Sequence, residues 1–125
     1  MSSSEWDPSA HLPLSVPVHQ ILLSLADVAR HGYAIIQDIR ERTDGDVALT
    51  ASTLYGALAR MLEGGTIEEV EPPADEEGGD ARRRYYRVTQ RGRALARAEA
   101  SRLARTLAQA RSRGLGPSAA DEGAR

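Results

Sequence analysis

The chain has 125 residues, of which 41% are hydrophobic and 27% are charged, and these fractions predict one globular domain with a modest core. It contains no cysteine, which excludes disulfides, thiolate metal sites and thiol catalysis, and no phenylalanine, so the core must be mainly aliphatic. The longest apolar run is too short to cross a membrane, and no leader pattern opens the chain, so we expect a cytoplasmic protein.

The net charge of −2 argues by itself against a nucleic-acid ligand. The charges are, however, segregated along the chain. Every charged residue between positions 63 and 80 is acidic, and every charged residue between positions 82 and 97 is basic. A phosphate group responds to the local field within about 10 Å at ordinary salt, so the basic segment keeps its potential to bind phosphate.

The N-terminal part of the chain is expected to hold an arm and one helix. Residues 1–13 lack periodicity and are predicted to be a mobile arm. Its Trp6 either folds back onto an apolar groove or is exposed, and exposure is the simpler expectation. Residues 16–29 are predicted to form a helix, with Pro17 in its first turn. The apolar face of that helix comprises Val18, Ile21, Leu22, Leu25 and Val28.

A second, shorter helix is predicted from Tyr33 to Arg42, because Ile35, Ile36 and Ile39 follow a helical spacing. His31-Gly32 interrupts the pattern before it. Residues 43–46 read Thr-Asp-Gly-Asp and predict a turn, and residues 47–49 are expected to form one short strand.

The third predicted helix, from Ala51 to Glu63, has an unusual outer face. Thr50 is a suitable N-cap and Gly64-Gly65 a suitable end. The inner face comprises Ala51, Leu54, Leu58, Met61 and Leu62, and the outer face comprises Ser52, Thr53, Gly56, Ala59 and Arg60, with Tyr55 at the border. Small, hydroxylated residues suit a surface that lies close against another object, and a DNA major groove admits one helix. A plain amphipathic core helix would show the same periodicity.

A hairpin and a long helix follow. Strands are predicted at 66–70 and 84–89, antiparallel, around a Pro-, Gly- and acid-rich loop at 72–81. Only one of Tyr85 and Tyr86 is expected to point inward, because neighbouring side chains of a strand face opposite sides. A helix is predicted from Gln90 to Ser112, and its thin apolar stripe favours self-association. The stripe comprises Leu95, Ala96, Leu103, Leu107 and Ala110, and all of these except Ala96 are the expected dimer contacts.

Three helices followed by a hairpin predict a mainly α fold, a winged helix-turn-helix. Helix 33–42 is then the positioning helix, helix 51–63 the recognition helix and the hairpin loop the wing. The expected organisation is a mobile arm at 1–13, a DNA-binding domain at 14–89, a dimerisation helix at 90–113 and a disordered tail at 114–125.

The chain resembles the PadR family of bacterial transcriptional regulators. The resemblance rests on LSLADVARHGYAI, STLYGALARMLEGGTIEEV and DARRRYYRVTQRGRAL, and it extends over residues 14–96. It implies a homodimeric repressor of an operator with dyad symmetry, associated with the nucleoid when bound, and released by a small aromatic or lipophilic effector. The DNA-contacting positions that it implies are Tyr33, Ser52, Thr53, Tyr55, Gly56, Arg83 and Arg84.

Thr50, Arg60 and Arg82 complete the predicted set of DNA-contacting residues. Each has a structural alternative: Thr50 as a helix cap, Arg60 as a partner of Glu63 or Glu41, and the wing arginines as partners of the acidic loop beside them. The acidic residues 75–77 make the wing tip itself poorly suited to phosphate. The three histidines lack a metal-ligand spacing and no Gly-rich phosphate loop follows a strand, so neither an enzyme nor a cofactor is expected. A winged helix that binds proteins instead of DNA is the alternative function.

Overall fold

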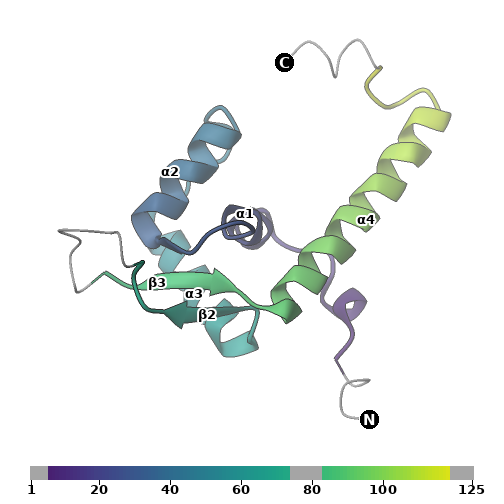
Figure 1. The fold of residues 1–125 in the computed structure, drawn as a ribbon. Coiled ribbons are helices and arrows are strands. Elements are labelled where there is room, and N and C mark those ends of the chain that lie inside the picture. The colour runs from purple at the N-terminus through teal and green to yellow at the C-terminus, as the bar shows by residue number, and fades with distance from the viewer. Residues whose placement is uncertain (1–5, 74–82, 119–125) are drawn as a thin grey trace.

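The computed structural model describes residues 6–73 and 83–118. Figure 1 shows the shorter α-helices and a small sheet packed together, with the long C-terminal helix leading away from them. The elements in chain order are η2 (Pro8–His11), α1 (Val16–Ser24), β1 (Arg30–His31), α2 (Gly32–Arg42), α3 (Ala51–Gly64), β2 (Ile67–Val70), β3 (Tyr85–Val88) and α4 (Gln90–Ser112). The predicted winged helix-turn-helix arrangement, mainly α with a small hairpin, is confirmed. The predicted wing tip, the first five residues and the last seven lie outside the described residues.

The sheet has three antiparallel strands in the order β1-β3-β2. In the predicted hairpin, Ile67 pairs with Val88 on the buried side, and Glu68 pairs with Arg87 on the exposed side. Arg87 donates hydrogen bonds of 2.9 and 2.6 Å to the Glu68 carboxylate, so this arginine is held within the sheet. β1 was not predicted, because a strand of two residues shows no alternation.

The strand expected at residues 47–49 is wrong. That segment is irregular, and the Val47 amide donates to the hydroxyl of Thr43 at 3.0 Å instead of to a neighbouring strand. Val47 and Leu49 are half-buried against the core, so their apolar character reflects packing alone. The third strand of the sheet comes from β1, which pairs with β3 through Arg30↔Tyr86 and His31↔Tyr85.

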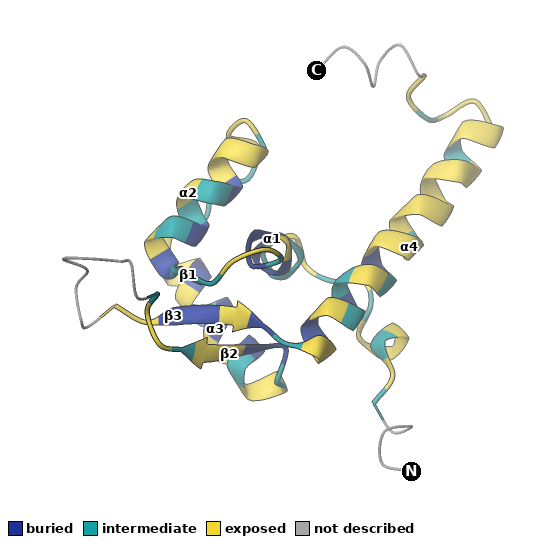
Figure 2. Ribbon diagram, viewed as in Figure 1, coloured by how far each residue is buried: buried dark blue, intermediate teal, exposed yellow. Residues whose placement is uncertain are grey.

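The core lies where α1, α2, α3, the sheet and the start of α4 meet (Figure 2). It is aliphatic apart from Met61 and Tyr86, as the composition predicts. On α3, Ala57 faces the core and Ala51 is exposed, which corrects the predicted inner face by one position. Each fully buried Leu or Ile contributes about 1.5–3 kcal/mol. Those with the least exposure are Ile21, Leu22, Leu25, Ile35, Ile39, Leu54, Leu58 and Ile67.

α1 ends at Ser24, five residues earlier than predicted, because side chains take the carbonyls that a longer helix would use. The Ser24 carbonyl accepts a 2.8 Å hydrogen bond from Arg30 Nε, and the Ala26 carbonyl accepts one of 3.0 Å from Arg93. Those two carbonyls would otherwise accept the amides four residues further on. Val28, predicted on the apolar face, is 47% exposed as a result.

The N-terminal segment is more ordered than the sequence suggests. Residues 8–11 form η2, which packs against α4 and is capped by the Asp7 carboxylate. The expected exposure of Trp6 is wrong, because its side chain is half-buried against the core. Its ring stacks on His11 at 5.6 Å, and the Arg91 guanidinium lies 4.7 Å from the ring centroid. A cation–π contact of this kind is worth about 0.5–1 kcal/mol at an exposed site.

Tyr85 and Tyr86 are both buried, which corrects the expectation that only one would be. They do face opposite sides of β3, and Tyr86 belongs to the main core. On the Tyr85 side, the ring of His31, which pairs with Tyr85 in the neighbouring strand β1, lies edge-on to the Tyr85 ring at 5.3 Å. The missed strand therefore explains the missed burial.

α4 starts at its Thr89 cap and packs directly on the sheet. A side chain at Gly92 would meet the Thr66 carbonyl oxygen and would lie 2.7 Å from Val88 Cγ2, so only glycine permits this approach. One turn later Leu95 is 5% exposed and belongs to the core. Among the described residues, no helix is long and apolar enough to span a membrane.

Candidate nucleic-acid interface

The start of α3 is fixed by one threonine. The Thr50 hydroxyl accepts a hydrogen bond from the Thr53 amide at 3.1 Å and donates to the Thr53 hydroxyl at 3.1 Å. At the other end of the helix, Gly65 adopts φ 78°, a left-handed conformation that favours glycine. Thr50 is therefore the predicted cap, and its exposed side chain orients the first turn of the helix.

The outer face of α3 is small and polar, as predicted. Ser52, Thr53, Ala59 and Arg60 are exposed and Gly56 is half-buried, while Leu54, Ala57, Leu58 and Met61 form the buried face. The Arg60 Nη1 atom lies 3.7 Å from where a Gly56 side chain would begin. The guanidinium therefore folds back over the glycine, along the exposed face, and leaves its charge on that surface.

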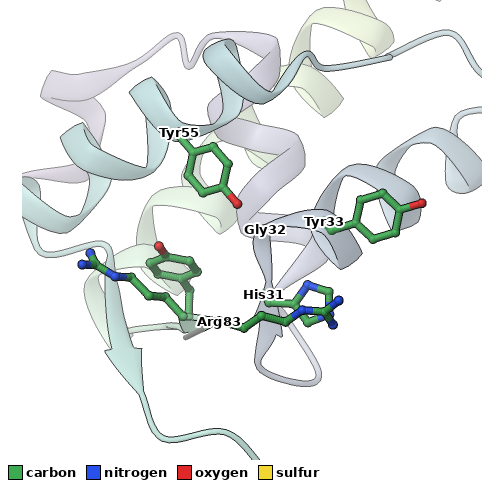
Figure 3. A pocket seen from close by; sticks show the side chains of 7 residues that line it. His31, Gly32, Tyr33, Tyr55 and Arg83 are labelled. Atoms are coloured by element: carbon green, nitrogen blue, oxygen red, sulfur yellow. The ribbon is translucent and has the colours of Figure 1, made fainter. Parts of the chain in front are cut away.

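A hollow of about 340 Å³ adjoins this face (Figure 3). Its walls come from the start of α2, from α3, and from the segment that enters β3. The structure thus brings four predicted DNA-contacting residues together from three distant parts of the chain. The lining residues are His31, Gly32, Tyr33, Tyr55, Arg83, Arg84 and Tyr86.

Two of these tyrosines are unusually exposed. Tyr33 is 60% and Tyr55 is 51% exposed, although each ring is large and apolar. The Tyr33 oxygen accepts a 2.9 Å hydrogen bond from Gln37 Nε2, which orients the ring and leaves the hydroxyl proton available to a further acceptor. Exposed tyrosines with a polar tip are typical of binding surfaces.

Tyr55 can reach α2 only because residue 32 is glycine. In Figure 3 the Tyr55 ring points toward Gly32. A Cβ atom at Gly32 would meet the Tyr55 hydroxyl oxygen and would lie 2.8 Å from its Cζ atom. Gly32, predicted to interrupt the helical pattern, is the first residue of α2 and lies directly against the Tyr55 ring. The one local feature that could have indicated this role is the position of Gly32 directly before the exposed Tyr33.

His31 was also missed as a member of this surface. Its Nδ1 atom accepts the Ala34 amide at 3.2 Å and so caps α2, and its Nε2 atom lies 3.1 Å from Arg83 Nη1. Figure 3 shows the two side chains next to each other. Histidine is not among the preferred cap residues, so no local pattern predicted this role.

Beneath the hollow, Tyr86 is kept neutral. Burial raises the pKa of its phenol, and the nearby Glu69 carboxylate adds to that effect. Arg84 is exposed beside it, and Arg82 lies outside the described residues. Among the described residues, no cluster of histidine and carboxylate side chains could hold a metal ion.

The residues predicted for dimerisation divide into two groups. Leu95 is buried in the core of the single chain, which corrects that assignment. Leu103 and Leu107 are 43% and 36% exposed on the outer part of α4, and Ala110 is half-buried. Between the two groups lies Glu99, which is 3% exposed and accepts hydrogen bonds of 2.8 Å from both Arg102 Nε and Nη2. These hydrogen bonds hold the pKa of the Glu99 carboxyl below its usual value.

The fold and this surface define the class of a winged helix-turn-helix protein. The family model for the transcriptional regulator PadR-like family matches residues 21–98, and the chain belongs to that family. Its members are transcriptional regulators and not enzymes. A curated protein from Lysinibacillus sphaericus, described as "Uncharacterized protein X", is 32% identical over 74 residues, which cover 59% of this chain and 65% of that protein. The match therefore spans less than two thirds of that relative.

Solved structures agree with this assignment. A PadR family transcription regulator from Clostridium difficile superimposes with a TM-score of 0.66 at 26% identity, covering 82% of this chain and 100% of that one. A transcriptional regulator from Clostridium thermocellum gives 0.63 at 28% identity, covering 78% and 90%. Bacillus subtilis PadR, solved in complex with operator DNA, gives 0.58 at 20% identity over 67% and 46%, a likeness of fold alone.

Proposed function

We propose that the chain is a homodimeric repressor that binds duplex DNA at an operator with dyad symmetry. The observation that carries the proposal is the continuous surface made by the exposed face of α3 and the hollow beside it. That surface combines small and hydroxylated residues with exposed tyrosines and the arginines at 83 and 84. The solved complex of Bacillus subtilis PadR with operator DNA supports the same use of a related fold.

The surface divides naturally into two kinds of contact. Ser52, Thr53 and Gly56 lie on a helix that the major groove admits, so they read base edges. Tyr33, Arg83 and Arg84 lie to the side of that helix, so they contact backbone phosphates, which set position and not sequence. Thr50 holds the first turn, Tyr55 lies at the border of the two groups, and Arg60 adds positive charge along the helix.

The dimer is proposed to form through the outer part of α4, where Leu103, Leu107 and Ala110 continue the apolar stripe beyond the core. A two-fold axis there would place two α3 helices in successive major grooves, about 34–36 Å apart. The symmetry of the operator follows from the symmetry of the dimer.

A small aromatic or lipophilic effector is proposed to release the DNA. Support for this part comes from a second hollow, of about 150 Å³, between α1 and α4. Its lining is mostly apolar, with Leu22, Leu23 and Val88 among its residues, and it also includes Arg93 and Arg97. Its volume suits a single aromatic ring, since an engineered apolar cavity of about 150 Å³ binds benzene. Benzoate and phenol are suitable probes, and neither should release DNA from a Leu23→Trp variant if this hollow is their site, because Leu23 lines the hollow but is 41% exposed and so can be enlarged without overpacking the core.

Fluorescence anisotropy tests the main proposal, with duplexes from upstream of the chain's own gene and a scrambled duplex of equal length. Arg83→Ala should weaken binding to every duplex alike and lower the salt slope by about 0.9. Ser52→Ala and Thr53→Ala should instead change the preference among duplexes. Arg105→Ala, an exposed arginine on α4, is the matched control and should bind like the wild type.

The alternative is a winged helix that binds proteins, motivated by the net charge of −2 and the acidic segment before Arg82. Absence of DNA binding at low salt, together with a partner that binds through Tyr55 or Arg60, would establish that function instead.

The division between base and phosphate contacts has its own test. It would be contradicted if Arg83→Ala, Ser52→Ala and Thr53→Ala all lowered the affinity equally for every duplex.

A further inference from the structure

The C-terminal end of α3 is joined to the beginning of α4 by two side chains. The Thr89 hydroxyl donates to the Gly65 carbonyl at 2.7 Å and accepts the Gly92 amide at 3.1 Å, so one hydroxyl links both helices. Arg91 Nη1 donates to the carbonyl of Gly64, the last residue of α3, at 3.3 Å. The final carbonyls of a helix have no partner within it, so these contacts supply what α3 lacks. We call this set of contacts the α3–α4 joint.

Arg91 needs support to be an effective part of the joint. Its side chain is exposed, and an arginine in solvent loses conformational entropy when it is held in one geometry. The Trp6 ring supplies that support, because the guanidinium lies over its face, 4.7 Å from the ring centroid. A guanidinium held over an aromatic face keeps its N–H donors, which lie in its own plane, available for hydrogen bonds. The ring therefore restrains Arg91 where it meets the Gly64 carbonyl.

The segment that carries Trp6 is itself fixed to α4. The ring stacks on His11 with 5.6 Å between the ring centroids, and η2 packs against α4 (Figure 1). Further along the segment, a backbone hydrogen bond joins Leu14 to the Glu99 carboxylate. Arg91 and Glu99 are about two helical turns apart, so the N-terminal segment follows α4 over that length. Trp6 is thus held at the joint by contacts on both sides of it.

We propose that Trp6 and Arg91 are positioning residues for operator binding, which hold α3 at a fixed angle to α4. Arg91 meets the last residue of α3, at the opposite end from Ser52 and Thr53, so it acts through the helix and not on the DNA. The proposed function, on which this inference rests, places α3 in the major groove and the outer part of α4 in the dimer. The angle between these helices then determines which half-site spacing the protein accepts.

The contacts limit the size of the effect. If a variant frees α3 from the joint, DNA binding must restore the angle, and the affinity falls by at most the stability that the lost contacts supplied. One cation–π contact and one hydrogen bond at an exposed site correspond to about three- to tenfold in affinity. A residue that does not contact phosphate releases no counterion, so the salt slope should stay constant.

Four variants and two matched controls test the joint. Trp6→Ala and Arg91→Ala each break the link, and the double variant completes a double-mutant cycle. Trp6→Phe keeps an aromatic face for the guanidinium and is the conservative replacement. Leu115→Ala removes an apolar side chain that is 83% exposed, and Arg105→Ala removes an exposed charge from α4.

Fluorescence anisotropy is measured with the tightest-binding upstream duplex and with versions that are one base pair longer or shorter at the centre. Each titration is repeated over a series of salt concentrations, below the thermal transition of each variant. We expect both alanine variants to bind the original duplex about three- to tenfold more weakly, to discriminate less among the spacings and to keep the wild-type salt slope. The double variant should lose no more than Arg91→Ala, because the ring acts through the guanidinium. Trp6→Phe should recover most of the affinity, and both controls should match the wild type.

The fluorescence of Trp6 reports on the joint directly, since it is the only tryptophan in the chain. Arg91→Ala should shift its emission to longer wavelength, because the guanidinium no longer covers one face of the ring. Arg105→Ala should leave the emission unchanged. An unchanged emission in Arg91→Ala would show that the guanidinium does not hold the ring, and would overturn the inference.

The binding outcomes separate the inference from the proposed function. Wild-type protein that binds no duplex at low salt, or binds all three spacings equally, overturns both. Wild-type protein that prefers one spacing, with Trp6→Ala equal to it on every duplex, overturns the inference alone. Weaker binding with an unchanged spacing preference would show that the joint does not set the angle, and fully additive losses would show that the two residues act separately. A salt slope lowered by about 0.9 in Arg91→Ala would make Arg91 a phosphate contact instead.

Discussion

Gly32→Ala should weaken DNA binding without unfolding the protein. The added Cβ would meet the Tyr55 hydroxyl oxygen, and it would lie 2.8 Å from Tyr55 Cζ and 3.2 Å from Leu54 Cδ2. Carbon atoms in contact normally lie about 3.5–4.0 Å apart, so the ring must retreat by more than roughly half an ångström. Because Tyr55 is 51% exposed, its ring can swing into solvent instead of pushing α2 away.

The expected effects on stability and on affinity therefore differ. Gly32 is the first residue of α2, so alanine gains only part of the advantage of about 0.5–1 kcal/mol that it has over glycine in a helix interior. This partial gain opposes the lost contact of the ring, so the free energy of unfolding should change by less than about 1 kcal/mol. Loss of one hydrogen bond from Tyr55 to a charged acceptor costs about 1.5 kcal/mol, or roughly tenfold in affinity.

A double-mutant cycle with Tyr55→Ala gives the decisive measurement. Anisotropy on one duplex would compare the wild type, the two single variants and the double variant, with thermal unfolding as the check on the fold. If Gly32→Ala acts by displacing Tyr55, it should have no further effect on affinity once Tyr55 is gone. Fully additive losses, or wild-type affinity for Gly32→Ala, would refute the reasoning.

Three other expectations follow from the packing of α4. Gly92→Ala should destabilise the fold by about 1–3 kcal/mol, measured by denaturant unfolding, because the new methyl group would lie 2.7 Å from Val88 Cγ2 and against main-chain atoms. Glu99→Gln should remove a pH-dependent part of the stability. The folded pKa of Glu99 lies below its usual value of 4.5, so its contribution is fully present above about pH 4.5 and is lost as the pH falls through the folded pKa. Leu103→Glu should give monomers in sedimentation with little change in unfolding, whereas Leu95→Ala should destabilise each protomer by about 2–5 kcal/mol.

Each of these expectations has a result that contradicts it. Gly64→Ala is the control for the first, since no atom lies within 4 Å of that position, and equal effects at the two glycines would remove the packing argument. A difference between wild type and Glu99→Gln that stays constant from pH 7 to pH 3 would show that the carboxylate has no special stabilisation. A Leu103→Glu protein that remains dimeric would move the interface elsewhere.

Much of the fold could be predicted from local signals. α3 and α4 have strong periodicity, threonine caps at Thr50 and Thr89, and a glycine at the end of α3, so their bounds agree with the prediction to within a residue. The hairpin was predicted from the alternation of apolar and polar residues on both sides of a loop rich in proline, glycine and acidic residues. Such signals lie within a few residues of the element that they define.

What the sequence did not predict depends on contacts between distant residues. The end of α1 is determined by Arg30 and Arg93, and the latter lies 67 residues from the carbonyl that it reaches. β1 and the burial of Tyr85 arise together from one strand pairing. In the candidate site, the tyrosines and arginines were named individually, but the pairing of His31 with Arg83, 52 residues apart, requires the assembled sheet.

The direct passage from β3 into α4 has a mechanical consequence. Only Thr89 separates the two elements, and Gly92 and Leu95 seat the helix on the sheet, so strand and helix move as one rigid lever. The part of α4 beyond Leu95 ends at Ser112 and extends roughly 25 Å at 1.5 Å per residue. A tilt of about ten degrees at Leu95 therefore moves the far end by roughly 4 Å. In the proposed dimer, substitutions at Gly92 or Leu95 would therefore change the spacing between DNA half-sites that the protein accepts. Every DNA-contacting side chain would stay the same.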